Sequence, residues 1–266
     1  METSTIRIAR LDSRALVRVS GPEARPFLHN LLTQDVASLA EAEVRFGALL
    51  SPPGRLLFDL FLWGGADAVL LDVAAERRDA LVHRLTMYRL RAAVQIEAME
   101  GAVFACWPGV AEGFVNDPRT PELGGRAIGG DPAGNASEAD YHAHRLAIGV
   151  PDPAADVGFD KTYPIEANFD LLNGIDFQKG CFIGQETTSR MKRRGAIRNR
   201  MLPILYDGPP PPTGAEVLNG ELRAGVTCTG RDGRGMALLR LDRIDGALTV
   251  EGRQVTVGRS DWLPAG

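Results

Sequence analysis

Residues 44–74 read "VRFGALLSPPGRLLFDLFLWGGADAVLLDVA" and set the fold of the first half of the chain. Three apolar segments, at 44–50, 55–63 and 68–74, are separated by the turn sequences "SPPGR" and "GGAD". Short apolar runs bounded by Pro, Gly and Asp are typical of β-strands joined by turns. The stretch therefore predicts three consecutive strands of a largely antiparallel sheet.

Helical and strand patterns alternate on both sides of this stretch. A helix is expected over 21–35, because four apolar residues within 27–32 share one helical face. A second helix is expected over 76–91, followed by strands at 93–99 and 102–107. This order predicts α+β layers, with helices packed on the sheets.

The N-terminus, "METSTIRIARLDSRALVRVSG", is rich in arginine, as transit peptides are. Its apolar residues nevertheless fit two short strands that pair about a turn near Asp12 and Ser13. We therefore expect a chain that is folded from its start, carries no targeting segment and is cytoplasmic.

The second half of the chain is richer in turn residues. Residues 108–140 are expected to form loops with short elements, and "DGPPPPTG" at 207–214 a stiff turn or linker. Closely spaced turn signals after it predict a small all-β barrel or sandwich. We expect an α+β region of two intertwined subdomains at 1–198 and a β-barrel at 199–266.

Composition excludes several classes of protein. The chain has 266 residues, 44% of them hydrophobic, which is enough for a substantial core, and its formal net charge of −4 argues against nucleic-acid binding driven by global charge. Cys106, Cys181 and Cys228 form no Cys-x-x-Cys pair, so neither a disulfide framework nor a self-contained metal site is expected. No apolar run reaches the roughly 20 residues needed to cross a bilayer, and no membrane contact is expected.

His142 and His144 give a weak metal signal in "YHAHRLAIGVP". They would share one face if this segment were a strand, although a short helix is equally open. A structural zinc site normally needs about four ligands, so the pair alone favours a surface feature over a metal site.

Residues 178–195, "QKGCFIGQETTSRMKRRG", differ from the rest of the chain. Gly180 and Gly184 bracket Cys181, so the backbone there can approach a ligand closely. A short helix is expected from Gln185, ended by Gly195, and its N-terminus would favour a thiolate. The alternative is that the cysteine is a buried small residue in a tight turn, and these residues alone do not decide between the two.

Positive charge follows directly. Six basic residues and no acid lie within 190–200, and all three of the chain's lysines, Lys161, Lys179 and Lys192, fall in the neighbourhood of residues 178–195. Such a block is often a solvated helix face, but it also suits phosphates, a multi-carboxylate tail or an acidic partner.

The motif "KGCFIGQE" at 179–186 resembles the signature of the YgfZ family, which is related to the glycine-cleavage aminomethyltransferase. The agreement extends over "YPIEANFDLLNGIDFQKGCFIGQETTSRMKRRGAIRNRMLPI", and more loosely over "RPFLHNLLTQDV" and "SPPGRLLFDLFLW". The resemblance implies a ring of α+β layers around a folate channel, with a small C-terminal β-barrel. It also implies tetrahydrofolate binding and a role in making or maintaining [4Fe–4S] proteins.

The resemblance assigns roles to particular residues. Cys181 would be a functional thiol, either redox-responsive or lending one ligand to a cluster shared with a partner, and Asp59 would contact folate. No metal is held by the chain alone, because clusters take about four thiolates. The other expected cofactor-binding residues are Lys179, Gly180, Gly184, Gln185, Glu186, Asn168, Arg190 and Arg194.

Several functions remain open at this point. The leading hypothesis is a tetrahydrofolate-binding accessory protein for [4Fe–4S] proteins, whose partners are iron–sulfur assembly or client proteins, including tRNA-thiolating radical enzymes. The alternative is a folate-dependent aminomethyl transferase, although only Asp59 stands where the transferases have a carboxylate pair. Direct RNA binding through 190–200 is the weakest hypothesis, and a monomer is expected.

Overall fold

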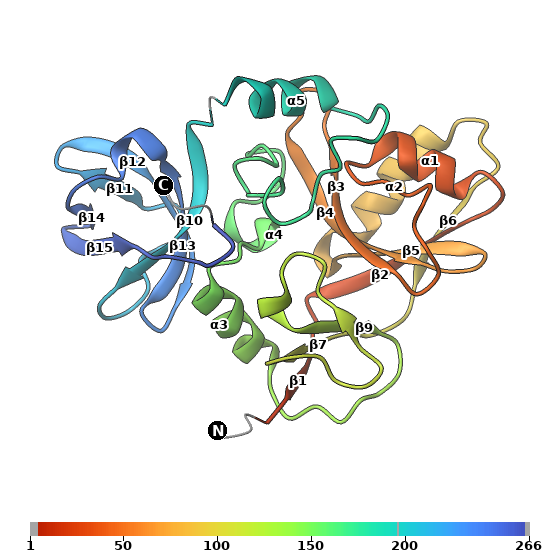
Figure 1. The fold of residues 1–266 in the computed structure, drawn as a ribbon, viewed down its shortest axis with the longest axis horizontal. Coiled ribbons are helices and arrows are strands. Elements are labelled where there is room, and N and C mark those ends of the chain that lie inside the picture. The colour runs from red at the N-terminus through yellow and green to blue at the C-terminus, as the bar shows by residue number, and fades with distance from the viewer. Residues whose placement is uncertain (1–4, 196, 264–266) are drawn as a thin grey trace.

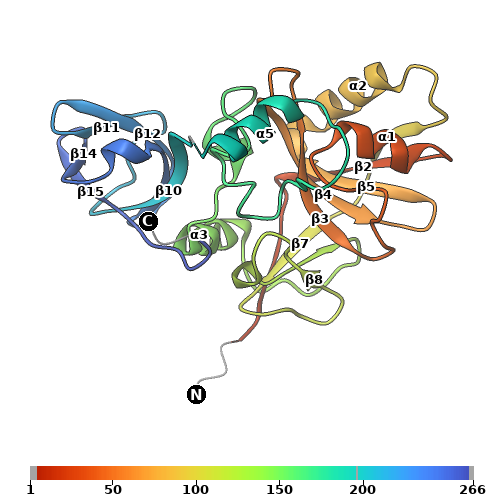
Figure 2. The ribbon, with the colours of Figure 1, turned by 45° about the horizontal axis from the view of Figure 1, so that its top comes forward.

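The computed structural model describes residues 5–195 and 197–263. Two antiparallel sheets and a closed barrel make up its β structure (Figure 1). The barrel lies at one end of the molecule and the larger sheet at the other, and helix α5 (Gln185–Arg194) lies between them in both views (Figure 2). The predicted α+β layers with a C-terminal barrel are therefore confirmed.

The larger sheet has five antiparallel strands in the order β3-β4-β5-β2-β6. The segments predicted from 44–74 form three of them, and the strand expected at 93–99 forms the edge strand β6. The bounds are β2 (Arg14–Ser20), β3 (Val44–Leu50), β4 (Leu56–Gly64), β5 (Ala68–Ala74) and β6 (Gln95–Met99).

Both faces of this sheet are covered, which explains why β4 is apolar along nearly its whole length. One face packs with α1 (Ala24–Leu31) and α2 (Arg78–Arg89), which follows the 3₁₀ turn η1 (Ala75–Arg77). The other face packs against buried residues from the second half of the chain, among them Phe169 and Phe182. Asp59 shares this inner face with Phe61 and Trp63, because side chains two apart on a strand point the same way.

The second sheet corrects the predicted N-terminal hairpin. Its order is β1-β7-β9-β8, formed by β1 (Arg7–Arg10), β7 (Val103–Trp107), β8 (Val115–Asn116) and β9 (Gly125–Ile128). β1 pairs with β7, whereas β2 pairs with β5 and β6 in the other sheet. The chain changes sheets at Asp12 and Ser13 because Ala9 and Leu11 are buried in a separate core with Val103 and Trp107.

Residues 138–148 form helix α3 (Glu138–Ile148), so the strand alternative for the two histidines is wrong. Ser137 and Asp140 form a reciprocal capping box, which fixes the helix start. The histidines are two apart on a helix and do not share a face: His144 stacks on Trp107, whereas His142 accepts a hydrogen bond from Arg145. The short helix α4 (Pro153–Asp156) follows, and the 3₁₀ turn η2 (Pro121–Leu123) lies in the preceding loops.

The C-terminal strands close a barrel with its own core, in the order β10-β13-β12-β11-β14-β15. "DGPPPPTG" lies between its first two strands in the chain, so it is a turn of the barrel and not a linker leading to it. The bounds are β10 (Asn199–Tyr206), β11 (Glu216–Asn219), β12 (Leu222–Arg231), β13 (Arg234–Arg240), η3 (Leu241–Arg243), β14 (Leu248–Val250) and β15 (Arg253–Val257). Among the described residues, no helix has both the length and the apolar character needed to span a membrane.

Candidate functional site

The segment that carries Cys181 is held firmly to the N-terminal sheet and to α1. The Asp176 amide donates to the carbonyl of Thr33 at 2.9 Å, and the Asp176 carboxylate accepts the amides of Gln178 and Lys179 at 2.8 and 3.2 Å. Phe182 is buried in the core on the inner face of the sheet. The backbone around the thiol is thus fixed on both sides.

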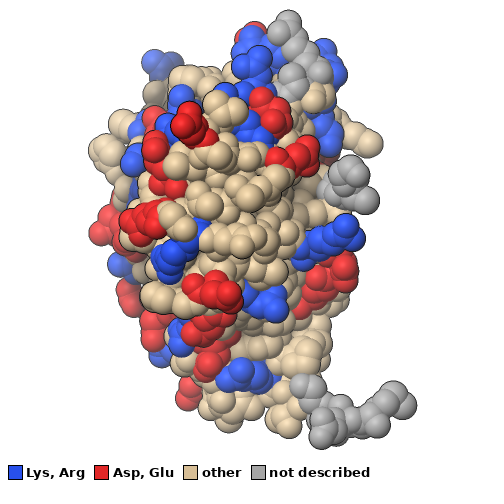
Figure 3. All heavy atoms as spheres, turned by 90° about the vertical axis from the view of Figure 1, so that its left-hand side faces the viewer, with Lys and Arg blue, Asp and Glu red and all other residues tan. Residues whose placement is uncertain are grey.

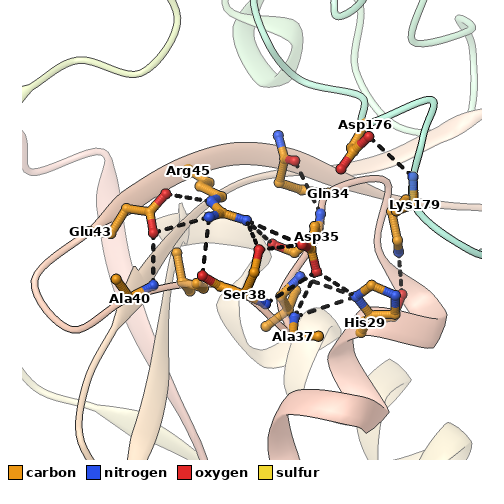
Figure 4. A network of polar contacts seen from close by, with 12 residues as sticks. His29, Gln34, Asp35, Ala37, Ser38, Ala40, Glu43, Arg45, Asp176 and Lys179 are labelled. Carbon is orange, nitrogen blue, oxygen red and sulfur yellow. Dashed lines mark hydrogen bonds and ion pairs between the residues drawn. The ribbon is translucent and has the colours of Figure 1, made fainter.

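Lys179 is a clamp between this segment and α1. Its ammonium donates to the carbonyl of Leu32 at 2.7 Å and to that of His29, at the C-terminal end of the helix (Figure 4). Cations are favourable at that end of a helix. Burial lowers the pKa of Lys179 to about 8, and the nearby carboxylates of Asp35 and Asp176 oppose this shift.

A network of polar contacts around Asp35 lies beside Lys179 (Figure 4). The carboxylate of Asp35 lies 2.9 Å from the ring of His29 and accepts the amide of Ala37 at 2.8 Å. Burial acts to raise the pKa of Asp35, but hydrogen bonds from Ser38 and Ala37 outweigh it and hold that pKa below its usual value. Asp35 therefore stays ionised and fixes the loop after α1.

Gly184 is required by packing within the chain. It has φ +80° and begins α5, and a Cβ there would lie 2.7 Å from the Cα of Gly54 and 2.9 Å from the carbonyl oxygen of Ser51. Gly54, with φ +90°, is equally restricted by Thr187. Gly180 differs, since a Cβ there meets no atom within 4 Å. Gly184 was predicted to let the backbone come close to a ligand. In the structure it lets the backbone come close to the turn at 51–54.

Cys181 is exposed, and Cys106 and Cys228 are buried. The interpretation of Cys181 as a packed core residue is therefore wrong, whereas the prediction that the other two cysteines belong to the core is confirmed. Burial raises the pKa of the Cys228 thiol well above its usual value, which keeps it protonated. Cys181 is the one exposed thiol within residues 5–195 and 197–263.

The expected helix after the thiol is α5, and Gly195 in the left-handed conformation ends it as predicted. Glu186, Arg190, Lys192 and Arg193 are exposed on it, as is Arg198 beyond it, and Gln185 is half-buried at its start. The side chain of Arg194, another predicted ligand contact, lies outside the described part of the structure. Figure 3 shows the barrel end of the molecule, where both signs of charge are interspersed and basic groups gather at the upper edge.

Arg200 does not belong to this exposed set. It is buried and donates to both carboxylate oxygens of Asp170 at 2.9 Å, and to the side-chain oxygen of Asn168 at 2.9 Å. Asn168 is fully buried, has φ +61°, and donates its amide to the carbonyl of Met201 at 2.7 Å. Both polar atoms of its side chain bond to residues of β10, which corrects its prediction as a ligand contact.

Asp59 lies in the middle of the molecule within a buried ionic network. Its carboxylate accepts from Arg14 at 3.0 Å, and Arg14 also donates to Asp72 at 2.6 Å. Asp72 in turn accepts from Arg126 at 2.6 Å, whose guanidinium lies 3.7 Å from the centre of the Phe61 ring. The Nε of Arg126 is buried without a hydrogen-bond partner in the described structure.

Two small cavities of about 20 Å³ each flank Asp59. An adjoining hollow of about 350 Å³ shares Ser13, Arg14, His142 and Asp152 with one of them. None of residues 179–186 lines any of these three spaces. The structure therefore separates Asp59 from the Cys181 segment, although both were predicted at one folate site.

The buried network was not found from the sequence. Its arginines come from distant segments, and this chain uses arginine for nearly all its positive charge, so none of them stood out. The available signal was Asp72, an acid inside the apolar run "AVLLDVA". Among the described residues, no group of three or more His, Cys, Asp or Glu side chains has the geometry to hold a metal ion.

Three comparisons relate this chain to known proteins. The family model "CAF17, C-terminal beta-barrel domain" matches residues 198–265. The Mus musculus protein named "Iron-sulfur cluster assembly factor IBA57, mitochondrial" is 33% identical over 303 residues, which cover 96% of this chain and 85% of that protein. The Homo sapiens protein of the same name is 34% identical over 301 residues, with the same two shares.

A solved structure supports the fold. The crystal structure of the glycine cleavage system aminomethyltransferase T from Bartonella henselae matches with a TM-score of 0.78 and 19% identity, covering 98% of this chain and 87% of that one. The chain has this aminomethyltransferase-like fold with a closed C-terminal β-barrel. The relatives are named as mitochondrial, and the cytoplasmic location of this chain stays a prediction.

Proposed function

The chain belongs to the IBA57 family of iron–sulfur cluster assembly factors, and from this premise we propose that it acts in the maturation of iron–sulfur proteins through the thiol of Cys181. The observation that carries the proposal is the exposed cysteine on a backbone that is clamped on both sides. Such a thiol can meet a partner protein without any rearrangement of its own chain.

The cluster is cargo in this proposal. One thiolate provides one ligand, and clusters are normally held by about four thiolates, so a partner protein or glutathione supplies the others. The exposed basic residues of α5 would face the partner, and carboxylates on the partner would match them. Client proteins would include the radical enzymes that thiolate tRNA.

The test is complementation of a strain that lacks this protein. Cys181→Ala should fail to restore the activity of [4Fe–4S] enzymes under oxidative stress. Cys106→Ala, which changes a buried thiol, is the matched control and should restore it if the variant accumulates normally. Full rescue by Cys181→Ala would remove the thiol from the proposal.

We also propose that the chain binds tetrahydrofolate next to Asp59. The donors and acceptors there fit a pterin: a carboxylate, several guanidinium groups and the unpartnered Nε of Arg126. The adjoining hollow of about 350 Å³ falls within the usual range of ligand pockets, whereas the cavities of about 20 Å³ hold no more than a water. Bound folate would supply a one-carbon carrier.

Calorimetric titration with mono- and polyglutamylated tetrahydrofolate tests this second proposal. Asp59→Asn should weaken binding of both forms, whereas Lys179→Ala weakens it only if the pocket includes the Cys181 segment. If the polyglutamylated form binds the wild type more tightly than the monoglutamylated form, and Arg190→Glu removes this difference in affinity, the basic residues of α5 contact the glutamate tail. No binding of either form would remove folate while leaving the role of Cys181 intact.

The transferase alternative has less support. The carboxylate of Asp59 already accepts a hydrogen bond from Arg14, and it has no second carboxylate beside it on β4. Turnover of methylenetetrahydrofolate with an aminomethyl donor, lost in Asp59→Asn, would be required to favour it.

A further inference from the structure

Among the residues that the structure describes, the most exposed large apolar side chain belongs to neither site described above. Leu90, directly after α2, is 86% exposed, and Met87 in the last turn of the helix is 48% exposed. Residues 87–91 are here called the Leu90 tip. They end α2 at the side of the molecule away from the barrel (Figure 1).

Leu90 also has a backbone conformation that rarely suits leucine. Its φ is +47° and its ψ −105°, and a positive φ is uncommon for any residue other than glycine. The conformation is imposed from both sides: the Ala92 amide donates to the carbonyl of Arg89 at 2.8 Å, and the Ala93 amide donates to the carboxylate of Glu23 at 2.5 Å. The chain thus keeps a leucine where it is both strained and exposed.

The tip is positively charged. No acid occurs between Asp79 and Glu97, a stretch that contains Arg84, Arg89 and Arg91. Among the residues that the structure describes, none of these three has a carboxylate within ion-pair distance. The carboxylate of Glu23 accepts the Ala93 amide, and that of Glu97, on β6, lies 3.9 Å from Arg18.

We propose that the Leu90 tip docks into an acidic surface of a partner protein that has an apolar pocket for the leucine side chain. Exposed strain of this kind persists where function requires it. A backbone held by hydrogen bonds loses little freedom when the leucine enters a pocket, and arginines around it select carboxylates at the rim.

A protein partner fits better than a membrane. A single myristoyl chain gives only marginal membrane binding, and the side chains of Leu90 and Met87 bury less apolar surface than such a chain. Insertion into lipid also demands no particular backbone conformation, whereas a pocket rewards a fixed one. The rigid left-handed leucine therefore favours a protein.

The test begins with Leu90→Gly, which relieves the strained backbone and removes the side chain. Its melting temperature should equal or exceed that of the wild type, so lost binding cannot be assigned to unfolding. Leu222→Ser, at the 60% exposed leucine on the barrel, is the matched control. A photo-crosslinking residue replaces the exposed Thr86 beside the tip, or Glu221 beside the control leucine.

The partner is captured by crosslinking the full chain in its host, then purified and titrated against each variant. The proposal requires capture from position 86 but not from 221, and affinity at least about tenfold weaker in Leu90→Gly and in the double variant Arg89→Glu, Arg91→Glu. Leu222→Ser should bind like the wild type, which restricts the effect to the Leu90 tip.

Three outcomes would overturn the proposal. They are absence of a protein crosslinked from position 86, unchanged affinity in Leu90→Gly, and a strongly destabilised Leu90→Gly chain. Binding of the wild type to vesicles with 30 mol% phosphatidylglycerol, lost in Leu90→Gly and without any captured protein, would instead identify the tip as a membrane contact.

Discussion

Replacing Gly184 by alanine should destabilise the protein far more than the same change at Gly180, four residues earlier in the same motif. At Gly184 the backbone has φ +80° and the added Cβ would lie 2.7 Å from the Cα of Gly54 and 2.9 Å from the oxygen of Ser51. At Gly180 the Cβ would meet nothing within 4 Å. The two changes are chemically identical, but the two sites differ in backbone φ and in the atoms that lie near the added Cβ.

The expected magnitude has two parts. A non-glycine residue in the left-handed region costs about 1–2 kcal/mol, and forcing an extra carbon into a packed site costs about 1–3 kcal/mol. Both contacts are to backbone atoms, so no flexible side chain can move aside. We therefore expect Gly184→Ala to lower the free energy of unfolding by about 2–5 kcal/mol, and Gly180→Ala to change it by less than about 0.5 kcal/mol.

Urea denaturation followed by tryptophan fluorescence measures both values, with the slope of the transition compared between variants. An unchanged slope with a lower midpoint for Gly184→Ala assigns the loss to the native state. Equal losses for the two variants, or a stable Gly184→Ala chain, would refute the argument that the turn at 51–54 dictates this glycine.

Three further predictions concern ionisable side chains that are buried or half-buried. Asp170→Asn leaves Arg200 buried without its counter-ion and should cost about 3–5 kcal/mol in urea denaturation; a loss below about 1 kcal/mol would contradict this. Burial lowers the pKa of both His142 and His144, so the native state binds fewer protons than the unfolded state below about pH 6.5. Stability should therefore decrease as the pH falls below about 6.5, and less steeply in His144→Gln; equal slopes by thermal denaturation would be inconsistent with a lowered pKa of the half-buried His144. Burial also lowers the pKa of Lys179 to about 8, so stability should rise between about pH 8 and 10.5 and Lys179→Met should flatten that rise; an unaltered profile would refute the shift.

The local elements could be predicted because their signals are local. The strands within 44–74 are marked by apolar runs and turn residues, and α5 by a helical composition ended by Gly195. Strand pairing is different, since β1 and β2 are neighbours in the chain but lie in different sheets. That choice depends on Val103 and Trp107, about 90 residues away, and no local pattern contains it.

The candidate site could also be predicted only in part from the sequence. The motif indicated that Cys181 matters, but its exposure follows from distant contacts of its neighbours, such as the bond of Lys179 to Leu32. Asn168 was assigned to the ligand site because it lies in the stretch of sequence that resembles the YgfZ family. Its real role depends on Met201 and Arg200, which become its neighbours only when β10 joins the barrel to the rest of the chain.

The clamp between Lys179 and α1 also has a consequence for synthesis of the chain. The contact joins residues 150 positions apart, and at a translation rate of about 5–20 residues per second the lysine emerges roughly 10–30 s after the helix that it will close. During that interval the end of α1 and the turn at 51–54 have no covering segment, and the nascent chain carries no Cys181 at all. The sheet on which Phe182 packs is therefore synthesised before the thiol, whereas Phe182 and Gly184, which fix the backbone after Cys181, follow it directly.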